Sequence, residues 1–301
     1  MIKRIFIFLL LNILIVLTIS FALNIFHVAP YLTSYGLDYK SLAVFCLLWG
    51  MGGSIISLLL SRYLAKWMLS VKLIDSSTND TTSKILIKIV TKLSHNAGLS
   101  VVPQIGIFEN REPNAFATGP SKKRSLIAVS TGLLNILSEE ELEGVIGHEI
   151  SHIANGDMVT MTLLQGVVNA FVMFMARAIA FAISSIVRDN RGRRQISSYG
   201  SYMLLTFVFE IVFMLLGSIV IAYFSRIREY RADKGSKEMV GKEPMINALK
   251  KLQLSQTIDD TSTKQQSIAA LMINCPKKLS RILSIFATHP SIEKRIARLN
   301  K

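Results

Sequence analysis

Two histidines and a glutamate within five residues carry the strongest chemical signal in this sequence, His148-Glu149-Ile150-Ser151-His152. Because an α-helix turns once in 3.6 residues, histidines four positions apart point off the same face, one above the other. Both imidazoles can bind one tetrahedral Zn²⁺, while Glu149 points to a neighbouring side and can act as a general base toward water. The chain has only 5 histidines, so this spacing is improbable by chance and predicts a hydrolytic site with one Zn²⁺ per chain.

The flanking residues predict that this stretch is helical. Ser138 and Glu141 have the spacing of a capping box, and acidic residues in a first turn suit the helix dipole. Apolar residues then recur at helical spacing up to Ile153, and Asn155-Gly156 is a typical stop signal. A buried helix that carries two histidines needs a partner for them, and a metal ion is the simplest one.

The composition is that of a membrane protein. Of the 301 residues, 50% are hydrophobic, and the mean hydropathy is +0.42. Four apolar runs are long enough for membrane helices: Ile5–Phe26, Ser41–Leu60, Val159–Val187 and Tyr202–Phe224. We read the first run as an uncleaved anchor and not as a signal peptide, because it is long and a second run follows closely.

Charge and cysteine content exclude two other classes of protein. The formal net charge is +14, which a membrane protein explains by basic segments beside anionic lipid, and no motif of a nucleic-acid-binding module is present. The 2 cysteines lie in different parts of the chain and imply no disulfide framework.

Basic residues also predict which side of the membrane the polar domain faces. Lys3 and Arg4 precede the first run, and Arg62 and Lys66 follow the second, so the positive-inside rule places both ends of this hairpin in the cytoplasm. The arginine-rich loop Arg188–Arg194 would then lie outside, against the rule. Either the first hairpin fixes the topology, or the second hairpin does not fully cross.

Two charged residues lie inside the second hairpin. Arg177 and Glu210 fall at similar depth if the two helices are antiparallel. We predict that they pair or that both line a polar cavity. The alternative is that these helices lie partly outside lipid and both charges are hydrated.

A zinc ion with two histidines needs a further protein ligand. The best candidate in the sequence is Glu229, and Asp233, one helical turn later, could accept a ring N–H from a ligand histidine. Two acids at this spacing are common on solvated helices, so the pattern alone does not prove the assignment.

In combination these motifs resemble a known family, the HtpX-type membrane zinc peptidases, which are bacterial relatives of the CAAX prenyl proteases. The resemblance covers essentially the whole chain and rests on His148–His152 with Asn155-Gly156-Asp157, on Arg228–Asp233, on Asn114–Gly119 and on Thr288-His289-Pro290. It implies His148, His152 and Glu229 as zinc ligands and Glu149 as the catalytic carboxylate.

The resemblance also implies an architecture. We expect a mainly α integral membrane protein with four hydrophobic helices and a zincin-like α+β metalloprotease domain that contains a small sheet. Residues 1–61 form the first membrane hairpin and 159–224 the second. Residues 62–158 and 225–301 together form the catalytic domain, the first part with the H-E-x-x-H helix and the second with the third zinc ligand.

The implied function is that of a gluzincin-like zinc metalloendopeptidase in the bacterial inner membrane. It would be a multi-pass protein with its catalytic domain facing the cytoplasm, where it cleaves misfolded or membrane proteins in envelope quality control under stress. Its expected partners are polypeptide substrates and membrane lipid, with no nucleic acid. The oligomeric state, the physiological substrates and any control of latency are open.

Short apolar or β-branched stretches before the H-E-x-x-H motif predict strands over residues 103–109, 114–119 and 125–130. An edge strand beside the zinc could hold an extended substrate, a role that we assign to Asn114, Ala115 and Phe116, although a plain structural hairpin is the alternative. His289 could stabilise the oxyanion, or it could simply precede a helix.

Three competing functions remain open at this point. A non-hydrolytic membrane protein with a structural zinc would ordinarily close its shell with four protein ligands, often cysteines. A metal transporter would carry its ligands inside membrane segments, whereas His148 precedes them. A protease for prenylated peptides is disfavoured by the four hydrophobic runs, since the prenyl-processing relatives have more membrane helices.

Overall fold

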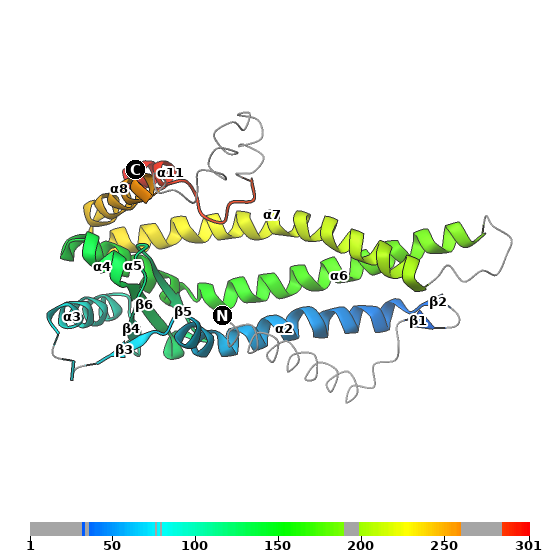
Figure 1. Cartoon of the computed structure of the whole chain (residues 1–301), viewed down its shortest axis with the longest axis horizontal. Helices are drawn as coiled ribbons and strands as arrows, with labels where there is room; N and C mark the ends of the chain where they lie inside the picture. The colour runs from blue at the N-terminus through cyan, green and yellow to red at the C-terminus, as the bar shows by residue number, and fades with distance from the viewer. Residues whose placement is uncertain (1–31, 34–35, 76, 79, 190–198, 260–284) are drawn as a thin grey trace. The chain divides into compact units, whose positions relative to one another are not determined.

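The computed structural model describes residues 32–33, 36–75, 77–78, 80–189, 199–259 and 285–301 (Figure 1). The chain forms two compact units. The first comprises Met1–Ser57 and Met161–Ile221, and the second comprises Leu58–Thr160 and Ala222–Lys301. Three helices contribute residues to both units: α2 (Tyr39–Met68), α6 (Asp157–Asp189) and α7 (Tyr199–Val240).

The first unit is built from the apolar parts of these three helices. A two-residue antiparallel pair, β1 (Leu32–Thr33) and β2 (Gly36–Leu37), precedes α2. Helices α2 and α6 approach closely at Gly50, where a methyl group would lie 2.6 Å from the backbone nitrogen of Ala170. Small residues at such a contact allow two helix backbones to pack closely in a membrane.

All three helices are long and apolar enough to cross a membrane. Only 6% of the apolar window of α7 is buried, and Leu204, Phe207 and Met214 are each more than half exposed. An apolar surface of this size marks a region of a protein that contacts lipid or another protein. The three helices therefore fit a membrane protein; the first apolar run of the sequence, Ile5–Phe26, lies outside the described residues.

Arg177 on α6 and Glu210 on α7 pair directly, as the sequence predicted. Arg177 Nη1 donates to Glu210 Oε1 at 2.6 Å, and the guanidinium also lies over the ring of Phe45 on α2, 5.7 Å from its centroid. The pair thus ties α6 to α7 inside the first unit. Pairing is what lowers the cost of two charges within an apolar segment.

The second unit contains a four-stranded mixed sheet in the order β3-β4-β6-β5. Its strands are β3 (Lys72–Ile74), β4 (Gln104–Phe108), β5 (Ala115–Thr118) and β6 (Leu126–Ser130). Strands β4 and β6 are parallel, whereas β3 and β5 run antiparallel to their neighbours and form the two edges. The three predicted strands are therefore confirmed, and β6 is buried along its whole length, as a central strand should be.

Helices pack against this sheet and against one another in the second unit. They are α3 (Thr81–Asn96), α4 (Thr131–Ile136), α5 (Glu139–Asn155), α8 (Lys242–Asp259) and α11 (Ile292–Leu299), with a short 3₁₀ turn η1 (Lys122–Arg124). Apolar side chains of α3, the sheet, α5 and α8 form one cluster that includes Leu86, Ile127 and Ile146, all fully buried. Helix α5, which carries the H-E-x-x-H motif, is thus fixed by packing along one side.

Candidate active site

Helix α5 begins and ends where its sequence signals predicted. Ser138 Oγ accepts a hydrogen bond from the backbone N–H of Glu141, and the Glu141 carboxylate accepts one from the N–H of Ser138, which completes the capping box. The helix stops at Asn155 because Gly156 adopts the left-handed conformation, with φ 71°. Both ends of the helix are confirmed, so the register of the two histidines on its surface is fixed.

His148 and His152 lie side by side on one face of α5. Both are buried, with residue exposures of 6% and 8%, and their Nε2 atoms are 3.2 Å apart. Ile146, Ile150 and Ile153 occupy the core side of the same helix. The imidazoles are therefore held out of water, with one nitrogen of each directed at the other.

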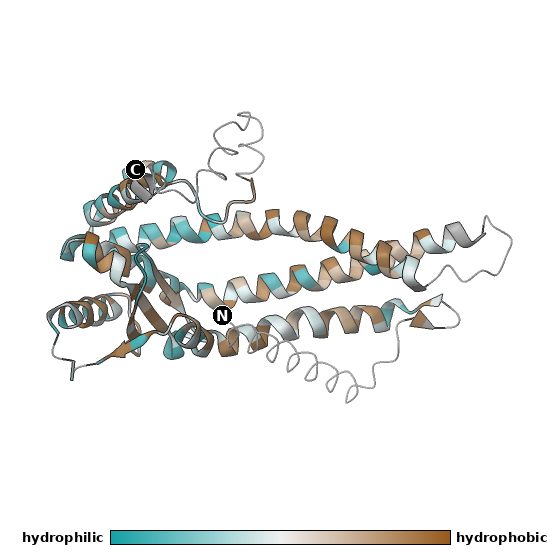
Figure 2. Cartoon of the chain, viewed as in Figure 1, coloured by the Kyte–Doolittle hydropathy of each residue, from teal (hydrophilic) through white to brown (hydrophobic). Residues whose placement is uncertain are grey.

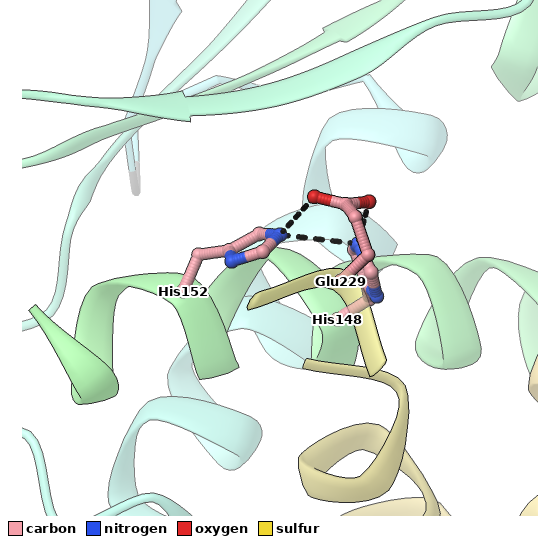
Figure 3. Close-up of side chains that lie close together, drawn as sticks. All are labelled: His148, His152 and Glu229. Carbon is pink, nitrogen blue, oxygen red and sulfur yellow. Dashed lines mark hydrogen bonds and ion pairs between the residues drawn. The ribbon is translucent and has the colours of Figure 1, made fainter. Parts of the chain in front are cut away.

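Helix α7 brings a carboxylate to these two nitrogens. Glu229 is 1% exposed, and its two carboxylate oxygens lie 3.5 Å from His148 Nε2 and 3.5 Å from His152 Nε2 (Figure 3). Helices α5 and α7 can approach this closely because Gly235 has no side chain. A methyl group at that position would collide with Ser151 Oγ. Ser236 Oγ also donates to the Gly144 carbonyl at 2.7 Å.

The geometry of these three side chains fits a metal ion. Tetrahedral zinc with bonds of about 2.0–2.1 Å places its ligand atoms about 3.3 Å apart, and the measured separations here are 3.2, 3.5 and 3.5 Å. All three side chains are buried, and their ligand atoms lie within 4.8 Å of one another. Lone pairs crowded together in this way, away from water, repel one another unless a cation or a proton lies among them.

Each histidine is oriented by a second carboxylate at its other ring nitrogen. His152 Nδ1 donates to Asp157 Oδ2 at 2.7 Å, and His148 Nδ1 lies 2.9 Å from Asp233 Oδ1. With the proton held on Nδ1, the lone pair of each Nε2 is available to a metal. The predicted contact of Asp233 with a histidine of the H-E-x-x-H motif is thus present in the structure.

Arginines in turn hold both of these carboxylates. Arg231 Nη2 donates to Asp157 Oδ1 at 2.6 Å, and Arg295 on α11 donates to both oxygens of Asp233 at 2.6 and 2.9 Å. The fork-shaped guanidinium of Arg295 matches the carboxylate, which fixes Asp233 in one orientation. Two chains of arginine, aspartate and histidine therefore converge on the same point.

Glu229 has two further partners besides the histidines. Arg228 Nη2 donates to Glu229 Oε1 at 2.8 Å, and His289 Nδ1 lies 2.9 Å from Glu229 Oε2. The structure thus brings His289 to the cluster, although its side chain is 64% exposed. His289 therefore lies at the solvent-exposed side of the Glu229 carboxylate.

The electrostatics of the cluster favour a positive charge at its centre. Burial of the His152 imidazole disfavours its protonation, but hydrogen bonds to Asp157 and Glu229 outweigh burial and raise the pKa of His152 to about 9. Without a metal, this site therefore holds a proton at neutral pH. A metal ion supplies the same positive charge and must displace that proton to bind.

The other predicted residues lie around the cluster. Glu149 is half-buried, and its charge acts on both His152 and Arg295. Strand β5, with Ala115 and Phe116, is an edge strand of the sheet and contacts α5. Asn114 is exposed and directly precedes β5, with its carbonyl oxygen accepting from the N–H of Ser130 at 2.8 Å.

Sequence reasoning did not assign roles to four residues that complete the cluster: Asp157, Arg228, Arg231 and Arg295. Asp157 follows the helix stop directly, and an acid just beyond an H-E-x-x-H helix is a usable signal for a residue that orients a histidine. Arg295 lies 62 residues from Asp233 in a tail rich in basic residues, and nothing in the local pattern distinguishes it.

Comparison with known proteins agrees with this geometry. The model of Peptidase family M48 matches residues 80–301. A protein named "Protease HtpX homolog" from Bacillus licheniformis is 46% identical over 304 residues, which cover 99% of this chain and 98% of that protein. Another of the same name from Methylacidiphilum infernorum is 40% identical and covers 100% of this chain and 99% of its own length.

A solved structure has a similar fold. The crystal structure of Ste24p from S. mikatae matches with a TM-score of 0.62 at 17% identity, over 97% of this chain and 66% of that one. At this identity the likeness concerns the fold alone. The resemblance to HtpX-type peptidases drawn from the motifs is confirmed by the full-length relatives, and the chain belongs to peptidase family M48.

Proposed function

We propose that this protein is a zinc-dependent endopeptidase whose metal is held by His148, His152 and Glu229. The observation that carries the proposal is the convergence of three buried ligand atoms at separations typical of one tetrahedral zinc. Three protein ligands leave a fourth position open, which is typical of catalytic sites and not of structural ones.

Zinc bound at this site would supply Lewis acidity, which polarises the scissile carbonyl and makes water more acidic. Glu149 takes the proton from the attacking water and returns it to the nitrogen of the leaving amine. Asp157 and Asp233 keep His152 and His148 in the correct tautomer while charge changes beside them. We assign to His289, whose Nδ1 lies 2.9 Å from Glu229 Oε2, a hydrogen bond to the oxyanion that forms at the reacting carbonyl.

Substrate would bind in an extended conformation along β5. The N–H of Ser130 donates to the carbonyl of Asn114, and the backbone groups of an antiparallel strand point alternately toward and away from its neighbour. The backbone N–H and C=O of Phe116 therefore point toward β6. Those of Ala115 and Ala117 point away from β6. Their N–H and C=O groups can pair with a substrate strand with little demand on its side chains. Ala117→Pro should raise KM without changing zinc content, whereas an unchanged KM would remove this role from β5.

We further propose that the protein is a multi-pass protein of the bacterial inner membrane that cleaves misfolded or membrane proteins on the cytoplasmic side. Three apolar helices and the basic residues Arg62 and Lys66, which directly follow the apolar part of α2, support this orientation. Labelling of single cysteines placed in the segment 188–194 and in η1 from either side of sealed vesicles tests it. Labelling of η1 from the outside would reverse the proposed topology.

The decisive test of the enzyme is one substitution on α5. Purified Glu149→Gln should retain zinc, measured by mass spectrometry of the metal, and lose cleavage of unfolded casein in detergent. Glu140→Gln, an exposed acid in the first turn of the same helix, is the matched control and should keep both. Retained cleavage in Glu149→Gln contradicts the mechanism, and retained zinc in a His148→Ala/Glu229→Ala variant contradicts the ligand set.

A further inference from the structure

A basic cleft lies between the charged part of α7 and helix α11, and its wall contains none of the three proposed metal ligands. Its volume is about 620 Å³, and its wall includes Ile227, Tyr230, Arg231, Lys234, Lys237 and Arg298. Five basic side chains line it against two acidic ones, Asp233 and Glu238. All of these residues belong to the second unit.

The positive charge of this cleft is only partly neutralised from within. Asp233 is paired with Arg295 and Arg231 donates one hydrogen bond to Asp157 at 2.6 Å, and both of these partners lie outside the cleft wall. Within the wall, Glu238 lies 3.5 Å from Lys234. Arg298 instead stacks over the ring of Tyr230, with its guanidinium carbon 4.4 Å from the ring centroid. Among the described residues, no carboxylate lies within ion-pair distance of Arg298 or Lys237, so the cleft is suited to an anion.

One end of the cleft is apolar and continues the lipid-facing surface of α7. Tyr223, Phe224 and Ile227 are 55%, 46% and 45% exposed, and Ile227 forms part of the cleft wall. Along α7 the residues change from hydrophobic to hydrophilic in this region (Figure 2). At 1.5 Å per residue, Arg231 lies about 10 Å beyond Phe224, near the outer limit of a headgroup layer of about 5–8 Å.

We propose that this cleft binds the headgroup of an anionic phospholipid. The phosphate would lie among Arg231, Lys234 and Arg298, and the acyl chains would run past Ile227 and Phe224 toward the apolar part of α7. An anion with an apolar tail matches both ends of the cleft, whereas free phosphate matches only one. The proposal does not depend on the peptidase activity, and a binding measurement tests it directly.

Such a lipid would join α7 to α11. Arg231 and Lys234 come from α7 and Arg298 from α11, so one phosphate can contact both helices at once. Helix α11 also supplies Arg295, which holds Asp233. Bound lipid would therefore help to keep α11 docked.

The test uses the full-length protein in neutral detergent with phosphatidylglycerol and phosphatidylcholine of identical acyl chains. Native mass spectrometry counts the lipid molecules retained, and we expect a clear preference for phosphatidylglycerol. Because each basic residue near an anionic lipid changes affinity about fivefold, the Lys234→Gln/Arg298→Gln variant should bind phosphatidylglycerol about thirtyfold more weakly. Arg298→Lys, which keeps the charge, should lose much less.

A matched control has the same charge change elsewhere. Lys84→Gln/Lys88→Gln on α3 removes two exposed lysines of the second unit and should keep the preference. Equal loss in both double variants would mean a general charge effect and would overturn the proposal, as would unchanged binding in Lys234→Gln/Arg298→Gln. Full displacement of the lipid by inorganic phosphate would show an anion site that does not recognise lipid.

Discussion

Replacing Asp157 by asparagine tests whether the carboxylate that orients His152, a proposed metal ligand, controls metal affinity. Asp157 is 1% exposed and accepts hydrogen bonds from His152 Nδ1 and Arg231 Nη2 at 2.7 and 2.6 Å. Asparagine keeps the size of the side chain and suits the first position of α6, so the helix should still form. What is lost is the negative charge that makes the His152 imidazole a stronger ligand.

The size of the effect follows from the two contacts. Loss of a carboxylate that orients a metal-bound histidine typically weakens metal binding 10- to 100-fold, or about 1.4–2.8 kcal/mol. Arg231 is more than half exposed and can be rehydrated, so its own loss of a partner adds little. Nearly all of the change should therefore appear in zinc affinity and not in folding.

Zinc affinity is measured by competition with a chromophoric chelator at fixed pH. We expect Asp157→Asn to bind zinc most weakly and Arg231→Gln to lose only a few-fold in zinc affinity. Asp75 is an exposed acid in a turn of the same unit, so Asp75→Asn should bind zinc as tightly as the unchanged protein. Zinc affinity of Asp157→Asn within twofold of the original would refute the role assigned to this carboxylate.

Three further predictions concern the bundle, the packing of α5 and the effect of pH. Arg177→Glu and Glu210→Arg should each lower the thermal unfolding midpoint in detergent, and the double swap should recover most of the loss; two additive losses would contradict the pairing. Gly144→Ala should cost about 1–3 kcal/mol of stability, seen as a lower unfolding midpoint, because the added methyl would lie 2.7 Å from the backbone nitrogen of Met245; an unchanged midpoint would contradict this packing. Because the pKa of His152 in the metal-free site is raised to about 9, zinc must displace a proton below that pH. Zinc affinity should therefore rise about tenfold per pH unit up to about pH 9 and then level off. A zinc affinity that stays constant from pH 6 to 9 would contradict this. The same shift stabilises the metal-free protein below about pH 6.5, and this contribution is lost as pH rises through 9.

Local patterns predicted the local structure of the site. The ends of α5 depend on contacts within a few residues, Ser138 with Glu141 and the turn at Gly156, so the sequence alone was sufficient to place them. The shared face of His148 and His152 follows from helix geometry in the same way. The strands before α5 were also predicted, because their apolar or β-branched composition and the residues that bound them are local features.

Contacts between distant segments were not predictable by the same reasoning. The bond from Arg231 to Asp157 spans 74 residues, and that from Arg295 to Asp233 spans 62. Many arginines in this basic chain could have satisfied either aspartate, and only the packing of α5, α7 and α11 selects the pair. The position of Glu229 is an intermediate case, because the spacing of the acids was ambiguous until the family resemblance favoured it.

Helix α7 extends well beyond the apolar run that hydropathy identifies. The apolar run ends at Phe224, yet the helix continues without interruption to Val240. Hydropathy reports what surrounds a segment and not where its backbone hydrogen bonds end. One continuous helix therefore carries both an apolar segment and the third proposed metal ligand.

The order of the ligands along the chain has a consequence for biosynthesis. Once α5 has been synthesised, the chain contains two of the three proposed metal ligands, and Glu229 is added only after α6 and the apolar part of α7. Until those segments have been synthesised and α7 has returned to α5, the nascent chain cannot assemble a complete hydrolytic centre. A fragment that ends before Glu229 would lack one of the proposed metal ligands and would therefore be inert toward other proteins of the cell.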